Sequence, residues 1–297
     1  MTTCIVACAA NENKYINEWI SYHLRLGFDK IYLYCNDIDP EPLYKTVLPW
    51  IDLGCVIFNH HPVPGEQNVM YMHYLHVYRM HDEWVSFLDV DEFFSIRECF
   101  SIKEFLRKRE NTDCIYFNWL RFGPNGYQET PSGLVLENYT RREKIVDSTF
   151  KIILKTSAID LQFMVDNRCP FQHGLGAGDW FFNPFNRNEN FKGRNVLGDN
   201  MREVLENPES YCLKKSEQIL WSATVAHFYL KSIDHYRQRS LRGKDLGPGW
   251  ELDWTRKFES GEYKKEIEKV SEVHDEWLSM RNKELKVFRR FSPNIVF

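Results

Sequence analysis

Short apolar runs alternate with amphipathic segments along the first hundred residues of the chain. Three runs have the length and composition of buried β-strands: residues 4–10, 30–36 and 54–60. Three segments repeat apolar side chains with helical spacing: residues 14–27, 43–51 and 68–81. Asn11 is predicted to cap the first helix and Gly27 to end it. Strands that alternate with helices predict an α/β fold, with a Rossmann-like, mostly parallel sheet flanked by helices.

The pattern changes after residue 100. Four later segments read as strands: residues 114–123, 139–145, 149–159 and 219–227. Residues 167–208 are rich in Gly, Asn, Pro and aromatic residues without a sustained period, which predicts a long functional loop. Residues 244–297 are expected to form a C-terminal helical extension, with residues 262–291 as one charged amphipathic helix.

Composition narrows the function classes. The chain has 297 residues, 43% of them hydrophobic, which is enough for a sizeable core. Its net charge of -4 gives no bulk attraction to nucleic acid, so nucleic acid is not an expected partner. Eight scattered cysteines without a C-x-x-C pair favour a reducing, cytoplasmic location. No stretch of eighteen apolar residues occurs, so we expect no integral membrane segment, although peripheral contact with a membrane is compatible with the sequence.

Residues 85–96 read VSFLDVDEFFSI and place three carboxylates, Asp89, Asp91 and Glu92, inside an apolar run. A buried carboxylate without a partner is costly, so these acids predict a bound cation or a hydrogen-bonded site. In an extended chain Asp89 and Asp91 project to the same side and can approach one ion. Oxygen ligands favour Mn²⁺ or Mg²⁺, which often accompany a phosphorylated substrate. The alternative is a solvated turn that carries acids by chance.

Five blocks follow one another along the chain: NENKYINEWISYHLRLGFDKIYLYCND, a Gln (Gln67) ahead of a helix, EWVSFLDVDEFF, WLRFGPNG and VAHFYLKSIDHYRQR. In this order they resemble the nucleotide-sugar glycosyltransferases of the GT-A fold, and are most similar to families 2 and 92. The resemblance covers about residues 2–243. It implies a domain over residues 1–243, with a nucleotide-binding half (1–100) and an acceptor half (101–243), and residues 244–297 lie outside it.

The resemblance implies a nucleotide diphosphate sugar as donor, with a UDP-sugar first, and a glycan or lipid-linked acceptor. The implied metal ligands are Asp89, Asp91 and His227. Residues implied to contact the donor are Ala9, Asn11, Glu12, Asn36, Asp37, Gln67, Asp89 and Lys231. One departure concerns the base or ribose site, where the family usually has Tyr-Asp-Asn and this chain has Tyr34-Cys35-Asn36-Asp37.

For an inverting member, which the resemblance implies, a carboxylate must take the proton of the acceptor hydroxyl. Asp179 is the first candidate for this base, followed by Glu129 and Glu217, and a capping or solvated Asp179 is the alternative. Two other functions remain open. A D-x-D after an apolar strand also begins haloacid-dehalogenase-like phosphohydrolases, but Phe93 occupies a position where those enzymes have Thr or Val. An inactive glycosyltransferase that acts as a binding module is the other.

Overall fold

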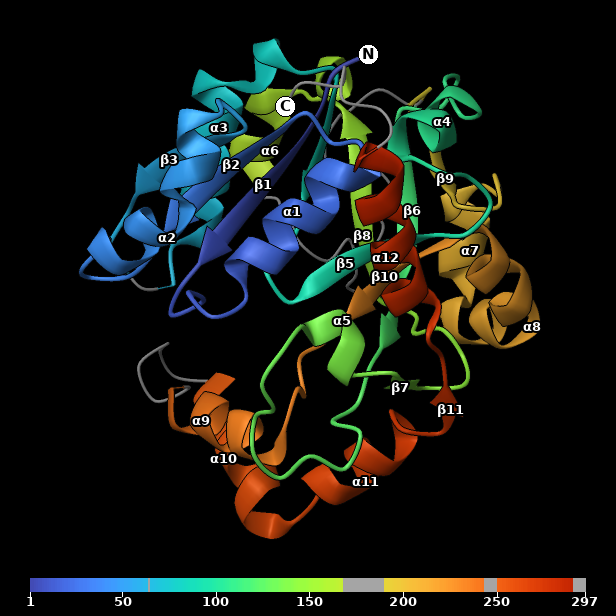
Figure 1. The fold of residues 1–297 in the computed structure, drawn as a ribbon. Coiled ribbons are helices and arrows are strands. Elements are labelled where there is room, and N and C mark those ends of the chain that lie inside the picture. Colours follow the sequence, from blue (N-terminus) through green and yellow to red (C-terminus); the bar gives the residue numbers. More distant parts are fainter. Residues whose placement is uncertain (64, 168–189, 243–249, 291–297) are drawn as a thin grey trace.

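A nine-stranded sheet forms the centre of the computed structural model, which describes residues 1–63, 65–167, 190–242 and 250–290. The strand order is β3-β2-β1-β4-β8-β6-β10-β5, and β9 pairs with β6 (Figure 1). The strands are β1 (Thr3–Ala9), β2 (Lys30–Cys35), β3 (Val56–His60), β4 (Trp84–Phe87), β5 (Glu92–Ile96), β6 (Cys114–Arg121), β8 (Phe150–Lys155), β9 (Gly193–Asn195) and β10 (Ala223–His227). Five of the eight pairings among these described strands are parallel, which confirms the mostly parallel α/β sheet.

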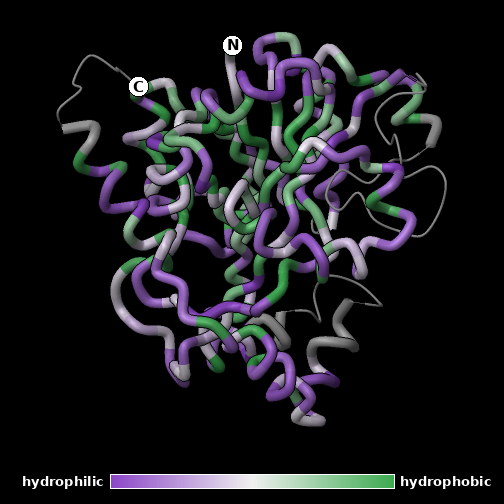
Figure 2. Tube along the Cα trace, turned by 90° about the vertical axis from the view of Figure 1, so that its right-hand side faces the viewer, coloured by the Kyte–Doolittle hydropathy of each residue, from purple (hydrophilic) through white to green (hydrophobic). Residues whose placement is uncertain are grey.

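Helices cover both faces of this sheet. Alternate residues of β1 enter two different cores: Ile5 and Ala7 pack into one, and Cys4 and Val6 into the other. The first core takes side chains from α1 (Ile16–Leu26), α2 (Glu41–Asp52), α4 (Ile102–Arg107), α5 (Val135–Asn138), α8 (Pro208–Ser222) and α12 (Trp277–Arg290). The second takes them from α3 (Gln67–Val77), α6 (Leu161–Asn167) and α7 (Met201–Glu206). Figure 2 accordingly shows hydrophobic segments through the middle of the molecule.

The first helix ends as expected but begins differently. Gly27 has φ +113°, and its N–H donates to the carbonyls of His23 and Leu24, which confirms it as the stop. Tyr15, not Asn11, occupies the position before the helix, and no side chain caps it there. Asn11 adopts a left-handed conformation with φ +58°, and its N–H donates to Asp37 Oδ1 instead. The prediction of Asn11 as a cap is therefore wrong.

Two apolar runs form shorter strands than their length suggests. The run over residues 83–94 divides into β4 and β5, because the Glu92 N–H donates to the Asp89 carbonyl and closes a turn between them. The run over residues 219–227 divides as well. Cys212, Ser216, Ile219 and Ser222 are buried at helical spacing, so α8 continues to Ser222 and β10 begins at Ala223.

The C-terminal extension packs against the rest of the fold. It contains α10 (Trp250–Ser260), α11 (Tyr263–Lys269), β11 (Val273–His274) and α12, so the single helix predicted for residues 262–291 is wrong. The break arises because β11 pairs with β7 (Arg141–Arg142) and the Asp275 N–H donates to the Thr140 carbonyl. Leu278 and Leu285 of α12 then enter the first core. Figure 1 shows α9 (Ile233–Arg242), α10 and α11 gathered at the end of the molecule nearest to α5.

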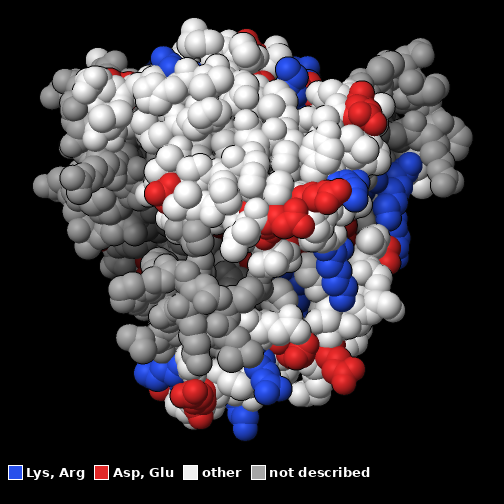
Figure 3. Space-filling view, turned by 90° about the vertical axis from the view of Figure 1, so that its left-hand side faces the viewer, with Lys and Arg blue, Asp and Glu red and all other residues white. Residues whose placement is uncertain are grey.

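The surface around α3 and the edge strand β3 is largely uncharged, as the upper part of Figure 3 shows. Neither element contains Asp, Glu, Lys or Arg. None of the described helices has the length and apolar content needed to cross a bilayer. The seven cysteines in the described part of the chain are free thiols, and the compartment stays a prediction.

Candidate active site

The candidate site lies where the carboxyl ends of β1, β4 and β10 meet. β4 ends at Phe87, and the next residue donates its N–H to the Val6 carbonyl, so the turn at 88–91 follows the end of β1. β5 returns antiparallel to β10, with Glu92 opposite His227. The predicted carboxylates therefore lie in a turn against the end of β10, at the edge of the sheet where open α/β folds bind ligands.

Asp89 is held from two sides. Its Oδ2 lies 2.8 Å from Lys151 Nζ, and its Oδ1 accepts a hydrogen bond of 3.0 Å from Gln67 Nε2. Gln67 also donates to the hydroxyl of Tyr71, which fixes the amide at the start of α3. The structure thus brings two predicted donor-contact residues, Gln67 and Asp89, into direct contact.

Glu92 is buried beneath this turn. Its Oε2 accepts the Asp89 N–H at 2.9 Å and lies 3.1 Å from Lys151 Nζ. Burial raises the pKa of the Glu92 carboxyl to about 8, Lys151 opposes this shift, and Asp89 and Asp91 add to it. Burial lowers the pKa of Lys151, but Asp89 and Glu92 outweigh it, so that pKa lies above its ordinary value. Lys151 is therefore the cation that neutralises these acids from inside the fold.

Asp91 and His227 face each other across β5 and β10. His227 Nε2 lies 3.5 Å from Asp91 Oδ1, and the Asp91 carbonyl accepts the N–H of Phe228 at 2.8 Å. The side chains of Asp91 and His227 are 12% and 10% exposed, so both can reach a ligand from a mostly dry setting. The ring of Trp119 lies 4.2 Å from that of His227, between centroids, and fixes its orientation.

Asp91 and His227 fit a divalent cation as part of a ligand set. A carboxylate and an imidazole suit Mn²⁺, and phosphate oxygens and water complete the shells of such ions. Both oxygens of Asp89 already accept hydrogen bonds, so its predicted role as a metal ligand remains a prediction. Within the described residues, no group of three or more His, Cys, Asp or Glu side chains is gathered to hold a metal.

The ends of β1 and β2 bring four further predicted residues together. The N–H of Asn36 donates to the Ala9 carbonyl, and the Asn36 amide donates to the carbonyls of His61 and Val63. Asp37 Oδ1 accepts the N–H of Asn11 at 2.8 Å. An acid thus lies beside Asn11 at the end of these strands, although the chain departs from Tyr-Asp-Asn in its order.

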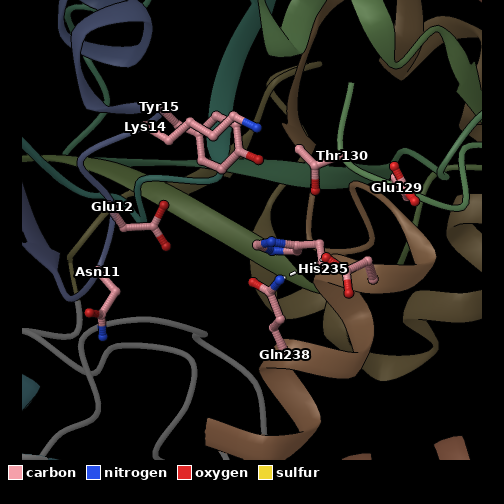
Figure 4. A pocket seen from close by; sticks show the side chains of 9 residues that line it. Asn11, Glu12, Lys14, Tyr15, Glu129, Thr130, His235 and Gln238 are labelled. Carbon is pink, nitrogen blue, oxygen red and sulfur yellow. Dashed lines mark hydrogen bonds between the residues drawn. The ribbon is translucent and has the colours of Figure 1, made fainter. Parts of the chain in front are cut away.

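A pocket of about 870 Å³ opens beside this edge. The segment after β1 forms one wall with Asn11, Glu12, Lys14 and Tyr15. The opposite wall comes from Glu129 and Thr130 and from Asp234, His235 and Gln238 of α9. In Figure 4 the Glu12 carboxylate and the His235 ring point toward each other across the cavity, below the Tyr15 ring.

Lys231 contacts Tyr15, one of the residues that line this pocket. Only 2% of Lys231 is exposed, and its ammonium lies 4.7 Å from the centroid of the Tyr15 ring. Its Nζ has no hydrogen-bond acceptor within the described part of the chain. A buried ammonium in this state has lost its water without gaining an acceptor, so an anionic group of a ligand would satisfy it.

A sequence model of glycosyltransferase family 92 matches residues 1–166, which is more than half of the 297 residues. The chain belongs to glycosyltransferase family 92. Membership in family 92 agrees with the first four of the five blocks, which lie within the matched region, and sets the phosphohydrolase alternative aside. The matched region contains Asp89, Asp91 and Lys151, whereas His227, Lys231 and α9 lie beyond it.

Two curated relatives match parts of this chain. A glycosyltransferase family 92 protein of Ricinus communis is 26% identical over 162 residues, covering 53% of this chain and 29% of that protein. The galactan beta-1,4-galactosyltransferase GALS3 of Arabidopsis thaliana is 32% identical over 92 residues, covering 27% of this chain and 18% of that protein. The matches therefore span less than a third of the length of these relatives.

A solved structure, the 4-diphosphocytidyl-2C-methyl-D-erythritol synthase of Anaerococcus prevotii, matches with a TM-score of 0.36 and 11% identity. The match covers 71% of this chain and 95% of that one. A similarity at this level carries no argument about the site of a family 92 protein.

The three candidates for the catalytic base in this family 92 chain have different positions. Glu129 lines the pocket. Glu217 lies on the exposed side of α8, the helix before β10. The predicted metal ligand His227 lies at the other end of β10, so Glu217 and the site are at opposite ends of this strand. Asp179 lies outside the described residues, so its role stays a prediction.

Sequence reasoning missed three residues of the site. Lys151 is the fully buried one of the two lysines in strand β8, and an unexplained charge in an apolar run was the available signal. Tyr15 and His235 lie within the blocks NENKYINEW and SIDHYRQR, but their spacing does not reveal that they meet. Their rings pack edge to face, with centroids 6.3 Å apart.

Proposed function

We propose that the protein transfers a hexose from a nucleotide diphosphate sugar to a hydroxyl group of a glycan or another acceptor, with inversion at the anomeric carbon. The observation that carries this proposal is Lys231, a buried ammonium without an acceptor in the described residues. It follows His227 by four residues and borders the pocket through Tyr15. A diphosphate at this place would meet a positive charge from which water has been removed.

The reaction requires three changes. The acceptor oxygen forms a bond to the anomeric carbon, and the bond from that carbon to the diphosphate breaks. Its electron pair passes to the diphosphate oxygen, where the Lys231 ammonium stabilises the developing charge. The proton of the acceptor hydroxyl passes to a carboxylate, for which Asp179 is the first candidate and Glu129 and Glu217 follow.

A divalent cation, Mn²⁺ or Mg²⁺, would be held by Asp91 and His227 and would supply a Lewis acid for the phosphate oxygens. Lys151 and Gln67 then have a different task, because they hold Asp89 and keep the turn in one conformation. Asp89 and Asp37 would contact the ribose or base of the donor, with Ala9, Asn11 and Asn36 around them.

The donor sugar is proposed to be galactose, carried by UDP. Two of the relatives are named as galactan beta-1,4-galactosyltransferases, GALS3 and GALS2 of Arabidopsis thaliana, which motivates galactose and a β-galactan acceptor. An inactive binding module is the second candidate, since a chain that binds donor without turnover would keep the same pocket.

A thermal-shift panel of UDP-, GDP-, CMP- and dTDP-sugars, each with Mn²⁺ or with EDTA, tests the proposal. A ligand at a hundredfold excess over its Kd stabilises the folded state by about 2.7 kcal/mol, which is easily measured. We expect UDP-galactose with Mn²⁺ to give the largest shift, and Asp91→Asn to abolish its Mn²⁺-dependent part. Asp52→Asn, at an exposed end of α2, is the control. Equal shifts in EDTA and in Mn²⁺ would contradict metal-dependent donor binding.

A further inference from the structure

The pocket beside Lys231 has the wrong charge for a nucleotide. Among the described residues that line it, Glu12, Glu129 and Asp234 supply three carboxylates and Lys14 supplies one ammonium. A diphosphate carries several negative charges, and like charges brought together in a partly enclosed cavity repel. Neutral polyols have no such conflict, because their hydroxyl groups donate hydrogen bonds to carboxylates.

We infer that this pocket binds the acceptor, as an uncharged oligosaccharide, and that Glu12 contacts the acceptor and not the nucleotide. The inference rests on the proposed glycosyl transfer and deepens it by assigning the acceptor site. It reverses the role that resemblance implied for Glu12.

The walls supply the groups that a sugar chain needs. Asp234 Oδ2 accepts a hydrogen bond of 2.7 Å from Gln238 Nε2, so this carboxylate is held in place at the start of α9. Thr130 is fixed in turn by the hydroxyl of Ser232, at 3.0 Å. Hydrogen-bond partners that are already positioned lose little conformational entropy when a ligand binds.

The pocket also has the size and the place that an acceptor site requires. A volume of about 870 Å³ lies near the upper end of ordinary ligand pockets and has room for more than one sugar ring. Tyr15 lines the pocket, and its ring also contacts Lys231, the group proposed for the diphosphate, which is not itself among the lining residues. With the diphosphate at Lys231, the acceptor would lie in the carboxylate-lined pocket next to it, with the reacting atoms between the two.

Isothermal titration of the full chain with three probes tests the assignment. The probes are neutral β-1,4-galactotetraose, its acidic counterpart β-1,4-tetragalacturonate, in which each C6 carbon is a carboxylate, and UDP with Mn²⁺, and neutral manno- and cello-tetraose extend the panel. We expect a neutral tetrasaccharide to bind and tetragalacturonate to bind at least tenfold more weakly. Saturating UDP should leave the affinity for the neutral sugar unchanged or increase it.

Two pocket variants, Asp234→Asn and Gln238→Ala, complete the test. Each should weaken the binding of the neutral sugar about tenfold, while the Kd for UDP stays within twofold of that of the unmodified chain. Gln218→Ala, which removes a glutamine from the exposed side of α8, is the matched control. Far-ultraviolet circular dichroism of each variant shows whether α9 is intact.

The outcomes separate the inference from the proposed function. If UDP competes with the sugar for binding, or if the variants weaken UDP binding as much as sugar binding, the pocket binds the nucleotide and the inference is wrong. Absence of pocket-dependent binding by every neutral tetrasaccharide also overturns it. If UDP with Mn²⁺ fails to bind the unmodified chain, the proposed sugar transfer is contradicted, whether or not the neutral sugars bind.

Discussion

Lys151 and Asp89 form an ion pair of 2.8 Å in which the lysine is fully buried and the aspartate is partly exposed. The same ammonium lies 3.1 Å from Glu92 Oε2. One internal cation therefore joins strand β8 to the turn that carries the predicted site acids. This contact explains how three carboxylates can lie close together at the end of apolar strands.

Lys151→Met should destabilise the fold strongly. Removing one partner of a buried ion pair leaves the remaining charges uncompensated, which costs about 3 kcal/mol or more. Urea denaturation of the variant measures the loss, and Lys155→Met, on the same strand with its ammonium near the surface, is the control. Adding Glu92→Gln to Lys151→Met should recover part of the stability. A single variant within about 1 kcal/mol of the unmodified chain would contradict the role of Lys151.

The sequence was sufficient for the architecture because apolar spacing repeats over whole elements. Residues 4–10, 30–36 and 54–60 each became a strand of the parallel half, and Gly27 ended its helix because its φ of +113° suits glycine. The split between β4 and β5 was not predictable from spacing. It depends on a hydrogen bond from the Glu92 N–H to the Asp89 carbonyl, which hydrophobicity does not encode.

The candidate site was predictable only in part. A local motif identified Asp89 and Asp91, since three acids in an apolar run are unusual. Lys151 is 62 residues from Asp89, and no local pattern joins two positions that meet only when β8 pairs with β4. The two walls of the pocket are likewise far apart in the chain, so its charge became visible only in three dimensions.

Lys231→Met should separate stability from ligand binding. Because the Lys231 ammonium is buried without an acceptor in the described residues, removing it should leave the free energy of unfolding unchanged or raise it by about 1 kcal/mol. Affinity for UDP should fall at least tenfold, whereas affinity for uridine should change little. Lys14→Met is the matched control, since the exposed Lys14 ammonium lies 5.5 Å from the same Tyr15 ring. Equal losses of affinity for UDP and for uridine would contradict a contact between Lys231 and the phosphate.

His23 should make the fold sensitive to acid. Burial lowers the pKa of this imidazole to about 3, and its hydrogen bond to the Trp19 carbonyl opposes the shift. The unfolded chain binds this proton near pH 6.5 and the folded chain does not. Stability from this group is therefore complete above about pH 6.5 and falls by up to about 1.4 kcal/mol per pH unit below it.

The measurement is the free energy of unfolding between pH 4 and pH 7 for the unmodified chain and for His23→Phe. The variant loses two hydrogen bonds at every pH, which lowers its stability throughout. The readout is therefore the slope of the free energy of unfolding against pH, not its absolute value. We expect a shallower slope. His76→Phe, at an exposed position of α3, is the control for removing one imidazole, and parallel curves for His23→Phe would show that the group does not contribute.

Asp275→Asn should loosen the C-terminal segment from the sheet. Asp275 Oδ2 accepts hydrogen bonds from Arg97 and Arg142, at 2.6 and 2.7 Å, and joins the segment before α12 to the ends of β5 and β7. Burial raises the pKa of Asp275, but Arg97 and Arg142 outweigh it, so the pKa lies below its ordinary value. Loss of this carboxylate should cost about 3 kcal/mol, measured by thermal unfolding, and Glu276→Gln at the exposed neighbour should cost little. An Asp275→Asn midpoint equal to that of Glu276→Gln would contradict the contact.

The identity of the catalytic base can be decided by two substitutions with different expected effects on kcat and KM. Asp179→Asn should retain the Mn²⁺-dependent UDP shift and lower kcat by about 10² to 10⁴, the usual contribution of a general base. Glu129 lines the acceptor pocket, so Glu129→Gln should raise the KM for the acceptor and lower kcat by less than tenfold. If Asp179 caps a turn instead, its substitution should cost about 1 kcal/mol of stability and leave turnover near normal. A large loss of kcat in Glu129→Gln together with a nearly active Asp179→Asn would move the base to the pocket wall, and a loss in neither would leave Glu217 as the remaining candidate.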